Sequence, residues 1–76
     1  MWRPASDLAP EAVARLQTLR ERRAEHEFQA AQFYERRKLI PSALVYYRTV
    51  VSNYAETSWA PRAAARVQAL EAHAHE

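Results

Sequence analysis

Cysteine and glycine are both absent from the 76 residues of this chain. Without cysteine, there can be no disulfide framework, no thiol nucleophile and no cysteine-ligated metal site. Without glycine, any left-handed turn must be formed by a residue that carries a side chain, which costs free energy. Alanine is the commonest residue and strong helix formers dominate the rest. The composition therefore predicts one small all-α domain.

Long apolar runs are missing as well. No stretch approaches the roughly 20 apolar residues that a membrane-spanning helix needs. The N-terminal sequence MWRPASDLAPEAV lacks the apolar core of a signal peptide. Residues 11–37 are too evenly charged to insert strongly into a membrane surface as an amphipathic helix. We therefore expect no direct membrane insertion by this chain.

The chain also lacks a strong excess of charge of one sign. Its net charge is only +2, because nine acidic residues are interspersed among eleven basic ones. Aromatic and basic residues do alternate in the stretch FYERRKLIPSALVYYRTVVSNY, where aromatics could stack bases and Arg36-Arg37-Lys38 could hold phosphate. Strong phosphate binders usually have a more one-sided charge balance. A basic helical nucleic-acid-binding module therefore remains an alternative, and a disfavoured one.

Patterns typical of catalytic or metal sites are not evident. None of the serines lies in a nucleophile elbow. His26 stands between Glu25 and Glu27, which point in different directions on a helix, so the three do not form a base catalyst. His73 and His75 are two residues apart and would lie on opposite sides of a helix, which does not suit a metal. We expect no catalytic residue, no metal and no cofactor, and hence no enzyme.

Apolar residues recur every three or four positions through most of the chain, which is the periodicity of amphipathic helices. The first helix should be continuous, because neither proline nor glycine interrupts it after Pro10, while Pro41 and Pro61 suit the first turns of the later helices. Short turns make neighbouring helices antiparallel. The predicted helices are about 7–37, 41–54 and 58–73, with a flexible lead-in at 1–6, caps at Ser6 or Asp7, and a frayed tail at 74–76.

The second half of this pattern fits a tetratricopeptide repeat (TPR), a helical hairpin with a period of about 34 residues. That pattern places small residues where the two helices touch, here Ala31 and Ala43, and aromatics beside them, here Tyr34 and Tyr47. The expected repeat core consists of Ala31, Tyr34, Ile40, Ala43, Tyr47 and Val50. One full repeat would span about 24–57 and the next would begin at 58, within a single domain of residues 7–73.

A closer resemblance lies in the stretch AEHEFQAAQFYERRKLIPSALVYYRTVVSNYAETSWAPRAAARVQAL. It is similar to the repeat region of the BamD (YfiO) family of outer-membrane assembly lipoproteins, whose members carry a phrase like L-R-x-R-x-A-E-H-E-F ahead of an F-Y-x-R-R-x-x-Y-x-A-A hairpin. A generic TPR would not predict that first phrase. The chain departs from the family pattern at two positions. The pattern favours a turn glycine where this chain has Lys38, and a connector proline where this chain has Ala55. The lipobox cysteine does not occur in this chain.

The resemblance implies a periplasmic scaffold at the outer membrane, within the β-barrel assembly machinery. Such a scaffold would bind a partner subunit or an extended segment of a client protein. In TPR arrays the first helix of each repeat lines a groove, so the expected protein-binding residues are Phe28, Gln32, Glu35 and Arg36. A periplasmic coordinator of the Tol-Pal system and a generic TPR adaptor are alternatives.

Two further expectations concern surfaces. Terminal faces of a helical repeat array stay apolar unless they are capped, so the isolated chain is expected either to be marginally stable or to self-associate. Phe33 and Tyr46 lie about 100° around their helices from the predicted core positions, which leaves open whether they are exposed.

Overall fold

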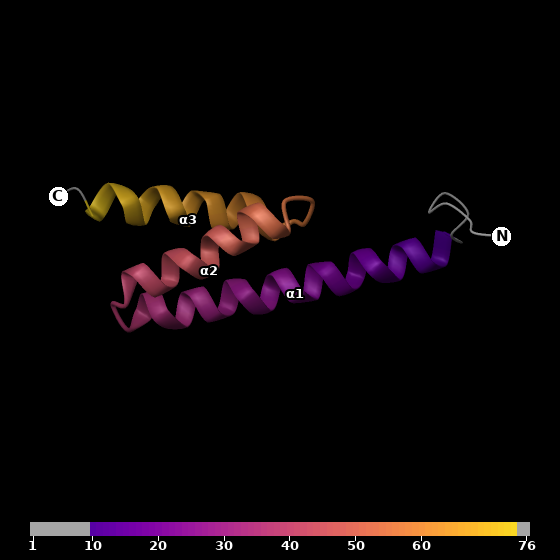
Figure 1. Cartoon of the computed structure of the whole chain (residues 1–76), viewed down its shortest axis with the longest axis horizontal. Helices are drawn as coiled ribbons and strands as arrows, with labels where there is room; N and C mark the ends of the chain where they lie inside the picture. The colour runs from indigo at the N-terminus through magenta and orange to yellow at the C-terminus, as the bar shows by residue number, and fades with distance from the viewer. Residues whose placement is uncertain (1–9, 75–76) are drawn as a thin grey trace.

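The structure is a computed structural model that describes residues 10–74, with the side chains of 73 and 74 excepted. Three helices make up most of this range: α1 (Pro10–Arg36), α2 (Ile40–Asn53) and α3 (Trp59–Ala74). They follow one another up and down, and α2 contacts both of the others (Figure 1). The expected all-α hairpin with a long first helix and a third helix is confirmed. The predictions for residues 1–6, for the caps Ser6 and Asp7, and for His75 lie outside the described residues.

The first helix extends well beyond the other two. Its 27 residues form an unbroken helix about 40 Å long at 1.5 Å per residue. Figure 1 shows that α2 and α3 lie along the C-terminal half of α1, while the N-terminal half projects alone. All three buried residues of α1 are accordingly in its second half: Ala24, Phe28 and Ala31. The N-terminal half of α1 thus has no helical neighbour within the described residues.

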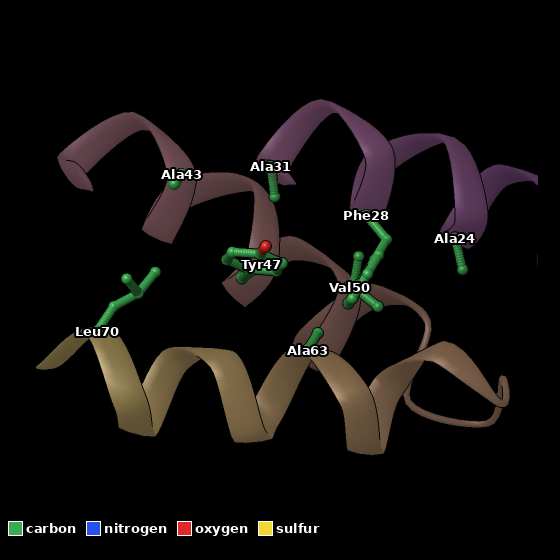
Figure 2. Packing of buried hydrophobic residues seen from close by; sticks show 8 residues of the cluster. All are labelled: Ala24, Phe28, Ala31, Ala43, Tyr47, Val50, Ala63 and Leu70. Atoms are coloured by element: carbon green, nitrogen blue, oxygen red, sulfur yellow. The ribbon is translucent and has the colours of Figure 1, made fainter. Parts of the chain in front are cut away.

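The core lies where the three helices meet, as Figure 2 shows. Alanines line the contacts between helices, and Tyr47 and Val50 are the largest side chains that are fully buried. The ring of Phe28 packs edge-on against Tyr47, with ring centroids 5.3 Å apart, and lies 5.1 Å from the ring of Trp59. The core cluster comprises Ala24, Phe28, Ala31, Ala43, Tyr47, Val50, Ala63 and Leu70.

The positions expected in the repeat core can be located in this cluster. Ala31, Ala43, Tyr47 and Val50 have exposed fractions of 0%. Tyr34 and Ile40 are partly buried and pack against the cluster. Because the two alanines carry only a methyl group, α1 and α2 can approach each other closely and enclose the Tyr47 ring.

The turn between α1 and α2 contains the only non-glycine residue with a positive φ among residues 10–74, Lys38, at φ 64°. The Leu39 amide donates to the Tyr34 carbonyl over 2.9 Å, and the Lys38 amide donates to the Glu35 carbonyl over 3.0 Å. These two bonds form a Schellman motif, which ends a helix with one left-handed residue, usually glycine. The position where the sequence lacks the family's glycine is therefore left-handed.

Replacing Lys38 by glycine is expected to raise the free energy of unfolding by roughly 0.5–1 kcal/mol, because glycine removes the steric cost of the left-handed backbone. Urea unfolding followed by circular dichroism measures this change. Arg37→Gly is the matched control, since residue 37 has no positive φ and glycine should only destabilise there. A loss of stability in Lys38→Gly equal to that in Arg37→Gly would contradict the prediction.

Candidate protein-binding surface

The four residues expected to line a groove separate into two pairs. Gln32 and Arg36 are exposed on α1. Phe28 is only 7% exposed, because Trp59 at the start of α3 packs on its ring. Glu35 is partly buried and its carboxylate is bonded to the other two helices. The expectation of one open groove therefore needs a correction, because α3 covers the side of α1 that carries Phe28 and Glu35.

Glu35 joins all three helices. It accepts a hydrogen bond of 2.7 Å from the Tyr47 hydroxyl on α2 and forms an ion pair with the Arg66 guanidinium on α3. Burial raises the pKa of the Glu35 carboxyl, but the hydrogen bonds from Tyr47 and Arg66 and the charge of Arg66 outweigh it, so the pKa is lowered overall. Burial and the bond to the carboxylate raise the pKa of Tyr47 to about 12. At neutral pH the carboxylate is charged and the phenol is neutral, which holds the helices together.

The lowered pKa of Glu35 predicts a loss of stability in acid. A carboxyl group whose pKa is lower in the folded state stabilises the fold fully above its unfolded pKa of about 4.3, and this contribution disappears as the pH falls below that value. The free energy of unfolding of the native chain should therefore decline more steeply below pH ~4.3 than that of Glu35→Gln. Urea unfolding over a pH series measures both slopes.

Glu56→Gln is the control for this prediction. The pKa of Glu56 is also lowered, chiefly by its hydrogen bond from Arg20, but both side chains are about half exposed and water weakens the pair. Its removal should flatten the acid slope less than the removal of Glu35. Parallel slopes for the native chain and Glu35→Gln would refute the role of the carboxylate.

The connector between α2 and α3 is fastened to α1 by two consecutive residues, Arg20 and Glu21. The Arg20 guanidinium donates to the Glu56 carboxylate and to the Asn53 carbonyl. The Glu21 carboxylate accepts from both the backbone amide and the hydroxyl of Ser58, each over 2.7 Å. Because Ser58 immediately precedes α3, Glu21 caps that helix from a different helix.

Sequence reasoning missed these contacts, although both residues lie in the phrase that most distinguishes the chain from a generic TPR. Glu21 and Ser58 are 37 residues apart along the chain. No local pattern indicates a partner at that distance. The specificity of the phrase was a signal that Arg20 has a defined contact, but Glu21 stands at one of its unspecified positions.

Three aromatic rings form a row along α1 and α2, beside the turn. Tyr34 stacks on Tyr46 with centroids 5.3 Å apart, and Phe33 meets Tyr34 edge-on at 5.4 Å. Phe33 is 45% exposed and the guanidinium of Arg37 lies 4.6 Å from its centroid. Tyr46 is half-buried. These contacts cover part of each ring, which leaves less free ring surface for stacked bases than the sequence alone suggested.

The described side chains include no group of three or more histidines or carboxylates that could hold a metal ion. The side chain of His73 and the whole of His75 lie outside them. Within residues 10–74, no helix is both long and apolar enough to cross a membrane.

Comparison with known proteins gives a family match. A protein-family model described as "YfiO: Outer membrane lipoprotein" matches residues 3–75, which is nearly the whole chain. No curated protein and no solved structure matches. The resemblance carried by the phrase around Arg20–Phe28 and by the following hairpin is thereby confirmed.

Proposed function

This chain belongs to the YfiO family of outer membrane lipoproteins, and from that premise we propose that it is a non-catalytic protein-interaction scaffold. It acts on the periplasmic face of the outer membrane, as part of a BamD-like assembly machinery for β-barrel proteins. The observation that carries the proposal is the family match over residues 3–75. The all-α hairpin supports it, because helical repeats present extended faces to other proteins.

In this proposal residues 24–57 form one TPR-like repeat and α3 opens the next. The packing of α3 against both helices of the hairpin supports that division. Gln32 and Arg36 remain exposed on α1, next to the bonded Glu35. A glutamine amide can bond a peptide backbone, and an arginine fork can pair with a carboxylate of a partner subunit or client polypeptide.

Site-specific photo-crosslinking in the cell envelope tests the proposal. A photoreactive residue at Gln32 or Arg36 of the full chain should crosslink to a subunit of the assembly machinery or to its client. The same residue at Ser52, which is exposed on α2, is the control and should crosslink much less. Crosslinks to Tol-Pal components would favour the alternative role of a Tol-Pal coordinator. Crosslinks to no envelope protein would reject the scaffold.

The nucleic-acid alternative requires a separate measurement. Labelled single-stranded and duplex nucleic acid can be titrated with the protein over a salt series. We expect weak binding, since Tyr34 is stacked on Tyr46 and meets Phe33 edge-on, which leaves less ring surface for bases. Micromolar affinity that falls steeply with salt would favour a nucleic-acid-binding module instead.

A further inference from the structure

A second line of side chains runs along α1, apart from the line that enters the core. The buried line consists of Ala24, Phe28 and Ala31. The second line is exposed at both ends, with Leu16 53%, Leu19 55% and Phe33 45% exposed. Steps of three and four residues alternate along it, which is the spacing of a coiled-coil seam. Its members are Leu16, Leu19, Arg23, His26, Ala30 and Phe33.

A hollow of about 480 Å³ lies in the middle of this line. Its walls come from α1 and from the end of α2, and Figure 1 shows that beyond this point α1 has no covering helix on its N-terminal side. The lining residues are Leu19, Arg22, Arg23, His26, Glu27 and Tyr54. A hollow between exposed leucines on one side and an exposed phenylalanine on the other suits a side chain projecting from a facing helix.

The charge beside this line is positive. Arg15, Arg22, Arg23 and Arg37 are exposed on or next to it. The three ion pairs found among residues 10–74 use other arginines, namely Arg20, Arg48 and Arg66. Glu27 is the one acidic residue that lines the hollow. A complementary surface would therefore bring apolar side chains flanked by carboxylates.

A second copy of this chain does not provide such a surface. If two α1 helices paired in parallel, Arg23 would face Arg23 across the seam. If they paired antiparallel about the hollow, whose α1 residues are centred near Arg23, Arg23 would again come opposite Arg23. Both arrangements set cation against cation, which is unfavourable at an interface.

We propose that the exposed line of α1 from Leu16 to Phe33 docks an amphipathic helix of a separate protein, with an apolar stripe bordered by aspartate and glutamate. The proposal rests on the scaffold function and names the chemistry of the partner. Apolar side chains of that helix contact Leu16, Leu19 and Phe33, and one enters the hollow. Its carboxylates pair with Arg15, Arg22 and Arg23. By helical spacing, Gln32 and Arg36 point to another side of α1, so this surface is distinct from theirs.

A pair of synthetic helices tests the proposal on the 76-residue chain. The first probe is a peptide of three heptads with leucine at positions a and d, glutamate at e and g, and alanine elsewhere. Its glutamates repel one another, so it does not pair with itself. The second probe carries lysine in place of glutamate. Titration calorimetry should show binding of the acidic probe, weakened by salt, and at least about tenfold weaker binding of the basic probe.

Variants locate the binding surface. Leu16→Ser with Leu19→Ser, and separately Arg22→Glu with Arg23→Glu, should each weaken binding of the acidic probe about tenfold or more. All four side chains are exposed, so these changes leave the core intact. Val45→Ser, which removes a 62% exposed valine from α2, is a matched control that should bind normally.

Three results would overturn the inference. These are equal binding of both probes, equal losses in the variants and their control, or a dimer in sedimentation that dissociates in Leu16→Ser with Leu19→Ser. The last result would show that a second copy covers this face. Envelope crosslinks at Gln32 or Arg36 without probe binding would refute the docking surface alone, whereas probe binding without any envelope crosslink would refute the scaffold function.

Discussion

Replacing Phe28 by alanine is expected to remove a large part of the stability of this domain. The side chain is 7% exposed and fills the space between Tyr47 of α2 and Trp59 of α3. Removing a buried aromatic ring leaves a cavity and costs roughly 3–5 kcal/mol. A chain of 76 residues has a total stability of only about 4–11 kcal/mol at typical values per residue. Urea unfolding followed by circular dichroism should show the midpoint falling steeply or the helices lost in buffer.

Phe33→Ala is the matched control, because it makes the same chemical change in the same helix. Phe33 is 45% exposed and keeps only its edge contact with Tyr34 and the cation–π contact with Arg37. Its loss should cost no more than about 1 kcal/mol. If instead Phe28→Ala unfolds like the native chain but loses binding to an envelope partner, Phe28 is a groove residue after all.

The local sequence pattern was sufficient to predict the three helices and their buried faces. The spacing of Ala24, Phe28 and Ala31 on one helix and of Ala43, Tyr47 and Val50 on the next places each trio on one face, and all six are buried. The prolines at 41 and 61 fall in first turns, as their missing amide requires. These features depend on neighbours within a few residues, and such neighbours are visible in a sequence.

The side of α1 that stays open could not be predicted in the same way. The TPR pattern assigns Phe28 and Glu35 to a groove by their place in a repeat, but α3 begins at Trp59 and lies over that side. The sequence did indicate that Glu35 faces the core, because Glu35 continues the core spacing of residues 24, 28 and 31. A carboxylate on a core-facing line needs a partner, since burying a lone charge is costly. That partner, Arg66, is 31 residues away along the chain.

The exposed line of α1 was not predicted from the sequence, for a related reason. Arg23 and His26 interrupt its apolar residues, so the middle of the helix read as charged nearly all round. This line is distinguished from the buried one only by the side of α1 against which α2 and α3 pack (Figure 1). A helix with one buried line and one exposed line has the pattern expected when a further helix is to pack on it.

Replacing Tyr47 by alanine should have an effect as large as the loss of Phe28, with a second component. Tyr47 is 0% exposed, and its ring fills the junction of the helices (Figure 2). Removing the ring costs roughly 3–5 kcal/mol. Removing its hydroxyl also takes one hydrogen bond from Glu35, which then depends on Arg66 alone. Urea unfolding should show a variant that is largely unfolded or barely stable.

Tyr47→Phe separates the two components, because it keeps the ring and removes only the hydroxyl. It should cost about 1 kcal/mol, the usual net value of one hydrogen bond, rising toward 2 if the carboxylate loses its main partner. Combining Tyr47→Phe with Glu35→Gln gives a double-mutant cycle. A coupling energy near zero would mean that Arg66 alone holds the carboxylate, and that the two residues stabilise the junction independently. A coupling of about 0.5 kcal/mol or more would show that the buried phenol and the carboxylate act as one link between α1 and α2.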